Sequence, residues 1–239
     1  MHRFYAPPQR IAGNSIVFDR DETRHLRDVL RLKSGDKVNV FDGAGNEYEC
    51  RIIEIKKAET LLLVDARVSP ISPESPLPLT LAAAMLKADK FDLVVQKAVE
   101  LGIKRLVPIR TVRCDIKSKD SARRHDRWLK IALESSKQTG RATLMTIDEP
   151  VEFSDLLANS QDRNLIMFSE RDGGKLCAIP DTEQLTAIVG PEGGWDDTEI
   201  DLARKTGITI VTLGGRILRA ETAAIAIAAV LQNRFGDLN

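Results

Sequence analysis

The chain has 239 residues, of which 43% are hydrophobic and 29% are charged. This composition is typical of a globular protein with room for two domains, and it excludes a membrane-spanning protein because no apolar run is long enough to cross a bilayer. Lys and Arg (35) balance Asp and Glu (35), but residues 83–145 carry 15 basic against 7 acidic residues, whereas 146–239 carry 8 against 16. This asymmetry predicts an anionic partner for the basic middle segment, although chance segregation of charge on a folded surface gives the same pattern.

The N-terminal residues and the cysteines indicate a cellular compartment. Residues 1–5 lack the apolar core of a signal peptide, and Cys50, Cys114 and Cys177 form no CxxC pair. Together these features predict a cytoplasmic protein without disulfide bonds and without a metal site.

The first 72 residues are predicted to form mostly strands. One short helix is expected at 21–32, where Leu26, Val29 and Leu30 share a face. Alternating or apolar runs predict strands at 15–18, 37–41, 47–55, 61–64 and 66–68. Short strands joined by Gly-containing turns favour a small β-barrel. Four of the ten prolines then fall within 70–78, which indicates a semi-rigid linker and predicts domains at 1–72 and 73–239.

After the linker, strands alternate with helices. Strands are expected at 79–85, 106–109, 144–147, 165–168, 186–189 and 208–213, and helices at 91–101, 122–137, 153–158, 197–206 and 220–235. This order predicts an α/β layer with a mainly parallel sheet. The last helix is apolar nearly all round, so we expect it to be buried, in part against a second subunit.

Three of the expected strands end in unusual loops, at 168–174, 189–194 and 213–222. Ligands of α/β sheets bind beyond the carboxyl ends of the strands, and glycine lets the backbone approach a ligand closely. One such loop is ordinarily a tight turn, but three together indicate a site. Arg216 and Arg219 precede a helix whose first turn holds Glu221; the helix dipole accounts for the acid but not for the arginines, which suggests an anionic partner outside the helix.

Other nucleotide and hydrolase signatures are absent. The segment 41–45 is similar to the DxGxG turn of Rossmann-type methyltransferases, but a second strand is expected after it where that motif needs a helix. No phosphate-binding P-loop occurs, and none of the three histidines belongs to a credible catalytic triad.

Two segments, IVGPEGG at 188–194 and LGGRILRAETA at 213–223, resemble the signature of the knotted SPOUT methyltransferases. Further matches at 87–102 and 138–141 extend the resemblance almost end to end, toward the branch that methylates N3 of a uridine in 16S ribosomal RNA of the small subunit. The resemblance implies a PUA-like β-barrel followed by a SPOUT α/β-knot domain with a deep trefoil knot. It also implies S-adenosyl-L-methionine as cofactor, small-subunit ribosomal RNA or the assembled subunit as substrate, and a homodimer whose active site uses both chains.

The resemblance also implies roles for individual residues. The expected cofactor-binding residues are Phe168, Ser169, Glu170, Val189, Gly190, Pro191, Glu192, Gly193, Gly194, Leu213, Gly214, Ile217, Leu218, Arg219, Thr222 and Ala223. Methylation of uridine N3 requires loss of its proton, so we expect Arg219 to stabilise the anion and Glu221 or Glu192 to accept the proton. The target base is expected to be unpaired or flipped.

Candidate phosphate contacts, each also readable as a solvated surface charge, are Arg3, Arg27, Arg31, Lys87, Lys90, Arg113, Lys117, Arg123, Arg124 and Arg141. Lys137 and Asp115 depart from the usual pattern of the family and put details of RNA contact in doubt. Three alternatives stay open: a non-catalytic RNA-binding module, a SPOUT methyltransferase acting on a ribose 2′-hydroxyl or on tRNA, and a nucleotide-binding metabolic enzyme.

Overall fold

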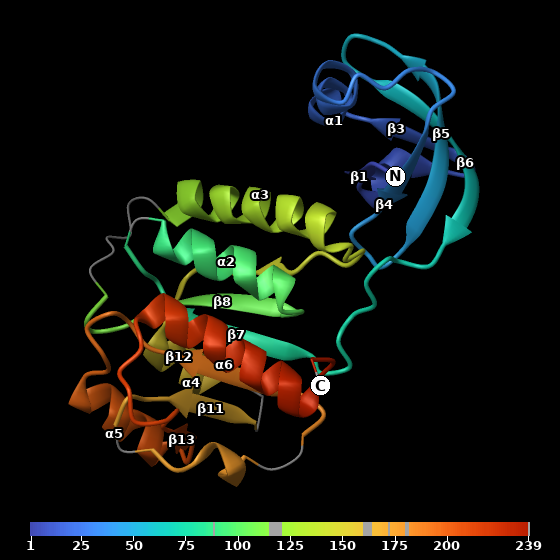
Figure 1. Ribbon diagram of the computed structural model, residues 1–239. Helices are drawn as coiled ribbons and strands as arrows, with labels where there is room; N and C mark the ends of the chain where they lie inside the picture. The colour runs from blue at the N-terminus through green and yellow to red at the C-terminus, as the bar shows by residue number, and fades with distance from the viewer. Residues whose placement is uncertain (88, 115–120, 160–163, 172, 180–181, 239) are drawn as a thin grey trace. The chain divides into compact units, whose positions relative to one another are not determined.

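The computed structural model describes residues 1–87, 89–114, 121–159, 164–171, 173–179 and 182–238 (Figure 1). The chain divides into two compact units. The first comprises Met1–Glu74 and Leu133–Leu144, and the second comprises Ser75–Ala132 and Met145–Asn239. None of the described helices is long and apolar enough to cross a membrane.

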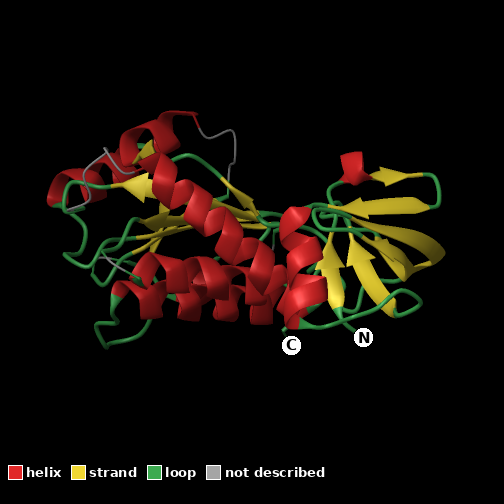
Figure 2. Ribbon diagram, turned by 90° about the horizontal axis from the view of Figure 1, so that it is seen from above, coloured by secondary structure: helices red, strands yellow, loops and turns green. Residues whose placement is uncertain are grey.

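The first unit contains a six-stranded sheet in the order β1-β4-β5-β6-β3-β2. Its strands are β1 (Arg3–Tyr5), β2 (Ile11–Ala12), β3 (Ser15–Phe18), β4 (Lys37–Phe41), β5 (Glu47–Ile55) and β6 (Thr60–Val68). The pairing of β1 with β4 is parallel and the other pairings are antiparallel. The sheet curls around a core that includes Phe4, Phe18 and Ile52 (Figure 2). The short alternating runs, from which a small β-barrel was predicted, therefore form a curled six-stranded sheet.

Helical structure in the first unit is short. A 3-10 turn (η1, Pro8–Arg10) joins β1 to β2, and α1 (Arg20–Arg24) continues into one turn of π-helix (η2, His25–Val29). Asp19 caps α1, since its carboxylate accepts hydrogen bonds from the backbone N–H groups of Asp21 and Glu22 at 3.0 Å. The expected helix at 21–32 ends before Arg31, whose φ of 55° is incompatible with a right-handed helix.

The segment after β4 is a turn, as predicted. The Asp42 carboxylate accepts hydrogen bonds from the backbone N–H groups of Ala44 at 2.7 Å and Asn46 at 3.0 Å. Gly43 and Gly45 have φ values of 79° and 96°, which favour glycine. The chain then enters β5, so the similarity to a Rossmann-type turn carries no cofactor site.

A return segment, residues 133–144, completes the first unit. The Arg3 guanidinium donates hydrogen bonds to the backbone carbonyls of Ser136 at 2.6 Å and Arg141 at 2.9 Å, and Leu144 N–H donates to the carbonyl of Gly43 at 3.0 Å. The predicted boundary at 72/73 stays a prediction. Sequence patterning did not separate this return segment from the second domain, because its contacts are made with residues that lie far earlier in the chain, 67 positions away for Glu74 with Arg141 and 138 for Arg3 with Arg141.

The second unit contains a parallel sheet in the order β10-β8-β7-β12-β11-β13, with β9 paired to β8. Its strands are β7 (Leu79–Ala84), β8 (Arg105–Arg110), β9 (Thr146–Ile147), β10 (Val151–Glu152), β11 (Leu165–Phe168), β12 (Leu185–Val189) and β13 (Thr209–Val211). Every pairing in it is parallel. Together with the curled sheet of the first unit, this parallel α/β layer confirms the predicted fold class.

Helices cover both faces of this sheet (Figure 1). They are α2 (Lys90–Glu100), α3 (Ser121–Thr139), α4 (Phe153–Asn159), α5 (Asp197–Lys205) and α6 (Ala220–Phe235), with a 3-10 turn, η4, at Leu176–Ala178. One core cluster joins α2, α3 and α6 to one face, and a second joins α4 and α5 to the other. Because β12 is buried along its whole length, it reads in the sequence as a nearly continuous apolar run, broken by Thr186 alone.

Candidate active site

The three glycine-containing loops meet because their strands are neighbours. The order β12-β11-β13 places the ends of these parallel strands side by side at one edge of the sheet. A pocket lies there, and its walls include these predicted cofactor residues: Phe168, Ser169, Glu170, Val189, Gly190, Pro191, Gly194, Leu213, Gly214, Ile217, Leu218 and Ala223. The structure therefore brings together residues from all three predicted loops.

The predicted set and the pocket wall differ in part. Four predicted cofactor residues, Glu192, Gly193, Arg219 and Thr222, do not line the pocket, whereas Trp195, Thr212, Gly215, Arg216 and Ala220 do. Gly215, Arg216 and Ala220 lie inside the recognised segment 213–223, and Trp195 and Thr212 directly adjoin the two segments, so extending each segment by one residue would have found them. The cofactor roles themselves stay predictions.

Trp195 connects two of the loops. Its indole Nε1 donates a hydrogen bond to the carbonyl oxygen of Phe168 at 2.8 Å, and the ring is 1% exposed. A Cβ atom at Gly190 would lie 2.8 Å from this ring, closer than side-chain carbons approach other atoms. The second position of the VGPEGG segment therefore requires glycine for packing against Trp195, in addition to any contact with a ligand.

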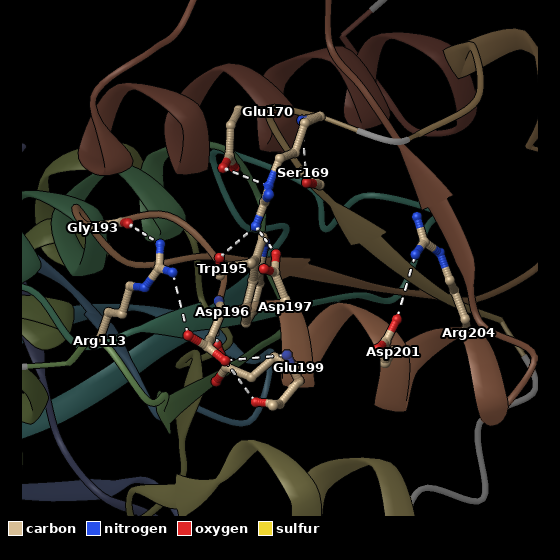
Figure 3. Close-up of polar contacts among 12 residues, drawn as sticks. Arg113, Ser169, Glu170, Gly193, Trp195, Asp196, Asp197, Glu199, Asp201 and Arg204 are labelled. Atoms are coloured by element: carbon tan, nitrogen blue, oxygen red, sulfur yellow. Dashed lines mark hydrogen bonds and ion pairs between the residues drawn. The ribbon is translucent and has the colours of Figure 1, made fainter.

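A network of polar contacts ties the loop after β11 to the start of α5 (Figure 3). The Arg171 guanidinium donates hydrogen bonds to the carbonyl of Trp195 at 3.1 Å and to the carboxylate of Asp197 at 2.6 Å. The Ser169 hydroxyl oxygen accepts a hydrogen bond from the Arg171 backbone N–H at 3.2 Å. Glu170 is exposed at the pocket and lies so near Gly194 that a Cβ there would be 2.8 Å from its Oε1.

The loop after β12 is held by the first turn of α5 and by Arg113 (Figure 3). Asp196 and Glu199 form a capping box, and Glu199 also accepts a hydrogen bond from the Val112 N–H at 3.0 Å. The Arg113 guanidinium donates to the Gly193 carbonyl at 3.1 Å and to the Asp196 carboxylate at 3.3 Å. Hydrogen bonds from Thr198, with a contribution from Arg113, hold the pKa of Asp196 below its ordinary value. The Arg113 guanidinium thus holds the loop through these two hydrogen bonds. Only the exposed part of the side chain that makes neither hydrogen bond is available to RNA.

The predicted catalytic residues occupy different environments. Arg219 is exposed and precedes the first turn of α6 without capping it. Glu221 is half-buried, and among the described residues its Oε2 has no hydrogen-bond partner. Glu192 forms an ion pair with Lys90, which was predicted to bind RNA. Of the two predicted bases, Glu221 is therefore the one whose carboxylate has an oxygen without a hydrogen-bond partner among the described residues.

Two of the predicted RNA contacts are corrected by burial. The Arg3 side chain is 6% exposed, pairs with Glu47 at 3.1 Å and stacks over the Phe41 ring at 4.0 Å. The Arg141 side chain is 4% exposed and pairs with Glu74 at 2.6 Å. Both guanidinium groups are used inside the first unit, so neither is available to phosphate. Sequence alone gave no sign of this, because the pairing carboxylates lie 44 and 67 residues away.

The other predicted RNA contacts stay predictions. Arg31, Lys87 and Arg123 are exposed, and Arg27 and Arg124 are partly exposed, with Arg27 paired to Asp28 at 2.6 Å. Lys117 lies outside the described residues, as does Asp115, one of the two noted departures from the family pattern.

The other departure, Lys137, is explained by a buried partner. Its ammonium group contacts the carboxylate of Glu22 in the first unit, and the two side chains are 11% and 9% exposed. Burial raises the pKa of Glu22 above its ordinary value, and the contact with Lys137 offsets part of this effect. The side chain of Lys137 therefore faces a protein carboxylate.

Comparisons with known proteins identify the family of the chain. A model of the RNA methyltransferase domain matches residues 73–232, and one of the RNA methyltransferase PUA domain matches residues 18–64. The chain is 33% identical over 229 residues to the ribosomal RNA small subunit methyltransferase E of Mesomycoplasma hyopneumoniae (strain 232), covering 94% of this chain and 96% of the relative.

Two solved structures are similar over nearly their whole length. A ribosomal RNA small subunit methyltransferase E from Neisseria gonorrhoeae, bound to S-adenosyl methionine, has a TM-score of 0.92 and 32% identity, covering 100% of both chains. A putative methyltransferase from Legionella pneumophila, in complex with the bound cofactor SAM, has a TM-score of 0.92 and 30% identity, covering 99% of both chains.

Proposed function

The chain belongs to the family of ribosomal RNA small subunit methyltransferase E, and from this membership we propose that it transfers a methyl group from S-adenosylmethionine to N3 of a uridine in 16S ribosomal RNA. It is an S-adenosylmethionine-dependent methyltransferase of small-subunit ribosomal RNA. The choice of uridine N3 rests on the resemblance of the 188–194 and 213–223 segments. The observation that carries the proposal is the convergence of the three motif loops on one pocket.

The pocket has the chemistry that the cofactor requires. Phe168, Val189 and Leu213 supply apolar wall, and Ser169, Glu170 and Thr212 supply polar groups. Gly190 lies in the pocket wall without a side chain, so a ligand can approach its backbone closely. We expect these residues to hold S-adenosylmethionine, which supplies the electrophilic methyl group. The protein has to orient the uridine, remove its N3 proton and stabilise the resulting anion.

The residues after β13 suit those tasks. Arg219 is exposed beside the pocket and can offer its guanidinium to the carbonyl oxygens on which the uridine anion is delocalised. Glu221 follows on the first turn of α6 and has an unpartnered oxygen within the described part of the chain. We assign it as the base in preference to Glu192, because Glu192 is already engaged in the ion pair with Lys90.

We further propose that the enzyme works as a homodimer in the cytoplasm, where small ribosomal subunits are made. Ile217 is 86% exposed beside the pocket, an unusual position for a large apolar side chain in a single chain. A second subunit that covers this loop would bury it and complete the substrate site.

The proposal is tested with labelled S-adenosylmethionine and two RNA substrates. Purified protein is incubated with small ribosomal subunits from a strain that lacks the enzyme and, separately, with bulk tRNA. We expect label in the subunit RNA, mapped to N3-methyluridine by nuclease digestion and mass spectrometry. Label in a 2′-O-methylated nucleotide or in tRNA alone would support the proposed cofactor but show that the proposed substrate is wrong. No label, together with no S-adenosylmethionine binding by calorimetry, would favour a non-catalytic RNA-binding module.

A further inference from the structure

A second pocket lies at the same edge of the sheet, between the end of β8, the start of α4 and one face of α5. We propose that it binds a phosphodiester group of the substrate RNA, close to the nucleotide that is methylated. The inference rests on the proposed function, because it assigns a further part of the RNA path on the same domain.

The pocket is rich in hydrogen-bond donors. Arg110 comes from the end of β8 and Lys205 from the last turn of α5, and Thr111 and Ser154 add hydroxyl groups to the wall. Thr198 also lines the pocket, but its hydroxyl already donates to the Asp196 carboxylate at 2.8 Å. Thr198 and Lys205 are seven residues apart, two turns of α5, so they share one face of that helix. Cationic side chains together with hydroxyl groups are the groups that bind phosphate in proteins.

Neither cation is fully used by the protein. Arg110 Nη1 donates a hydrogen bond to the Pro150 carbonyl at 2.9 Å, but its buried Nε has no partner in the described ranges. Thr111 Oγ1, beside it, is also buried without a described partner. Lys205 is exposed, and no ion pair of its ammonium group occurs with any described residue. Unpaired polar groups in a pocket wall are costly, and a ligand that pairs with them recovers part of that cost.

The two carboxylates of the pocket wall do not cancel this charge. Glu199 is 5% exposed, and its oxygens accept hydrogen bonds from the N–H groups of Val112 and Asp196, both at 3.0 Å. Glu152 lies 3.5 Å from Arg110, but its side chain is 55% exposed and can turn into solvent. A phosphate group would therefore contact Arg110 and Lys205. The Glu199 carboxylate is already hydrogen-bonded within the protein, and the Glu152 side chain can turn away into solvent.

The position of this pocket connects it to methyl transfer. Its wall includes Phe153, whose ring lies 5.0 Å from the ring of Trp195 in the wall of the cofactor pocket. Thr198 follows Trp195 by three residues, and Arg113 braces the loop between them (Figure 3). One aromatic contact thus separates the two pockets, so an RNA strand can place a base at the first while its backbone passes over the second.

The test compares two lysines in the second unit. Lys205→Gln removes the cation at the pocket, and Lys104→Gln removes an exposed cation at the opposite, amino end of β8. We expect Lys205→Gln to weaken binding to small-subunit RNA about fivefold and to reduce the slope of log affinity against log salt by about one. KM for the RNA rises by the same factor, whereas kcat and the affinity for S-adenosylmethionine do not change. Lys104→Gln leaves all five quantities at their wild-type values.

A second measurement identifies the source of the phosphate. Inorganic phosphate, added at constant ionic strength, should inhibit RNA binding by the wild type more than by Lys205→Gln. If the two lysine variants bind RNA equally, the proposal is wrong; if phosphate still protects Lys205 from acetylation in that case, the pocket holds a free anion instead of RNA. Failure of the proposed function is distinguishable, because the wild type would then transfer no methyl group to subunit RNA, whatever the lysine variants bind.

Discussion

At the scale of single residues, Trp195 shows how one hydrogen bond can organise a binding site. Its Nε1–H group donates to the Phe168 carbonyl, so the loops that follow β11 and β12 are joined at the pocket wall. Phenylalanine keeps most of the ring packing but cannot donate this hydrogen bond, and it leaves the carbonyl oxygen unsatisfied. The loss of one such bond costs about 1 kcal/mol, or roughly fivefold in affinity.

We therefore predict that Trp195→Phe raises the dissociation constant for S-adenosylmethionine about fivefold, by isothermal titration calorimetry. Trp128→Phe is the matched control, because Trp128 is also buried and also packs on a phenylalanine, Phe91 at 4.5 Å, but lies outside the cofactor pocket. It should lower stability with little change in cofactor affinity. Equal effects of the two substitutions on affinity would show that packing, and not the hydrogen bond, positions the loops.

The second prediction concerns the role of Arg219 in methyl transfer. If its guanidinium stabilises the uridine anion, Arg219→Ala lowers kcat about 100-fold or more while the calorimetric affinity for S-adenosylmethionine stays near the wild-type value. Arg105→Ala, at the amino end of β8, is the control for loss of one positive charge. Wild-type kcat in Arg219→Ala would remove this residue from the mechanism.

At the scale of elements, patterns with a local cause were predictable and those with a remote cause were not. The helices α2, α5 and α6 and the strands β7, β11 and β12 lie where periodicity placed them, because each buries a regular apolar face or a continuous apolar run. Other elements differ. The expected strands at 61–64 and 66–68 are one strand, β6, and the unpredicted strands β1, β2 and β10 have only two or three residues, too few for a period to be visible.

The same difference between local and remote causes applies to the candidate site. Its loops were predictable, because the glycines and the other motif residues are required by the local backbone conformation. The neighbouring pocket beside α5 was not, because Arg110, Ser154 and Lys205 come together only through the order of the strands and the packing of two helices. The pairing of Lys137 with Glu22 was hidden for the same reason, since it joins the end of α3 to α1 across 115 residues.

That ion pair predicts a pH dependence of stability. Lys137→Gln leaves the Glu22 carboxylate buried without its cation, which should cost about 3 kcal/mol of unfolding free energy at pH 8. Burial already raises the pKa of Glu22 in the folded wild type, and the substitution removes the contact that opposes this rise. The folded state then binds a proton that the unfolded state releases. The destabilisation is therefore present above the raised pKa and shrinks as pH falls toward the pKa of an unfolded glutamate.

Urea unfolding of the wild type and of Lys137→Gln at pH 5 and pH 8 measures this difference. We expect the gap between the two proteins to be smaller at pH 5. Glu22→Gln combined with Lys137→Gln is the control, because it removes both charges and should abolish the pH dependence of the gap. A gap that is the same at both pH values would assign the cost to packing of the lysine side chain.

At the scale of the whole molecule, two expectations depend on more than local pattern. The trefoil knot is implied by the resemblance of the motif segments and stays a prediction, because threading of a chain leaves no trace in hydrophobic periodicity. The homodimer has an additional physical argument in α6. Thr222, Ala226, Ala229 and Asn233 recur at helical spacing along one face, and all four are at least partly exposed in the single chain although the helix is mainly apolar.

A face of small residues that stays partly exposed on a mainly apolar helix is expected to be covered in the assembly, which leads to the last prediction. Ala229→Arg places a long charged side chain on this face, away from the buried positions Ala228 and Leu231, so the fold of one chain should tolerate it. We expect sedimentation to show a dimer for the wild type and a monomer for the variant. If the active site uses both chains, the monomer also loses methyl transfer. Thr146→Arg, on the exposed end of β9, should remain dimeric and active. A dimeric Ala229→Arg would exclude this face from the interface, and an active monomer would place the complete site within one chain.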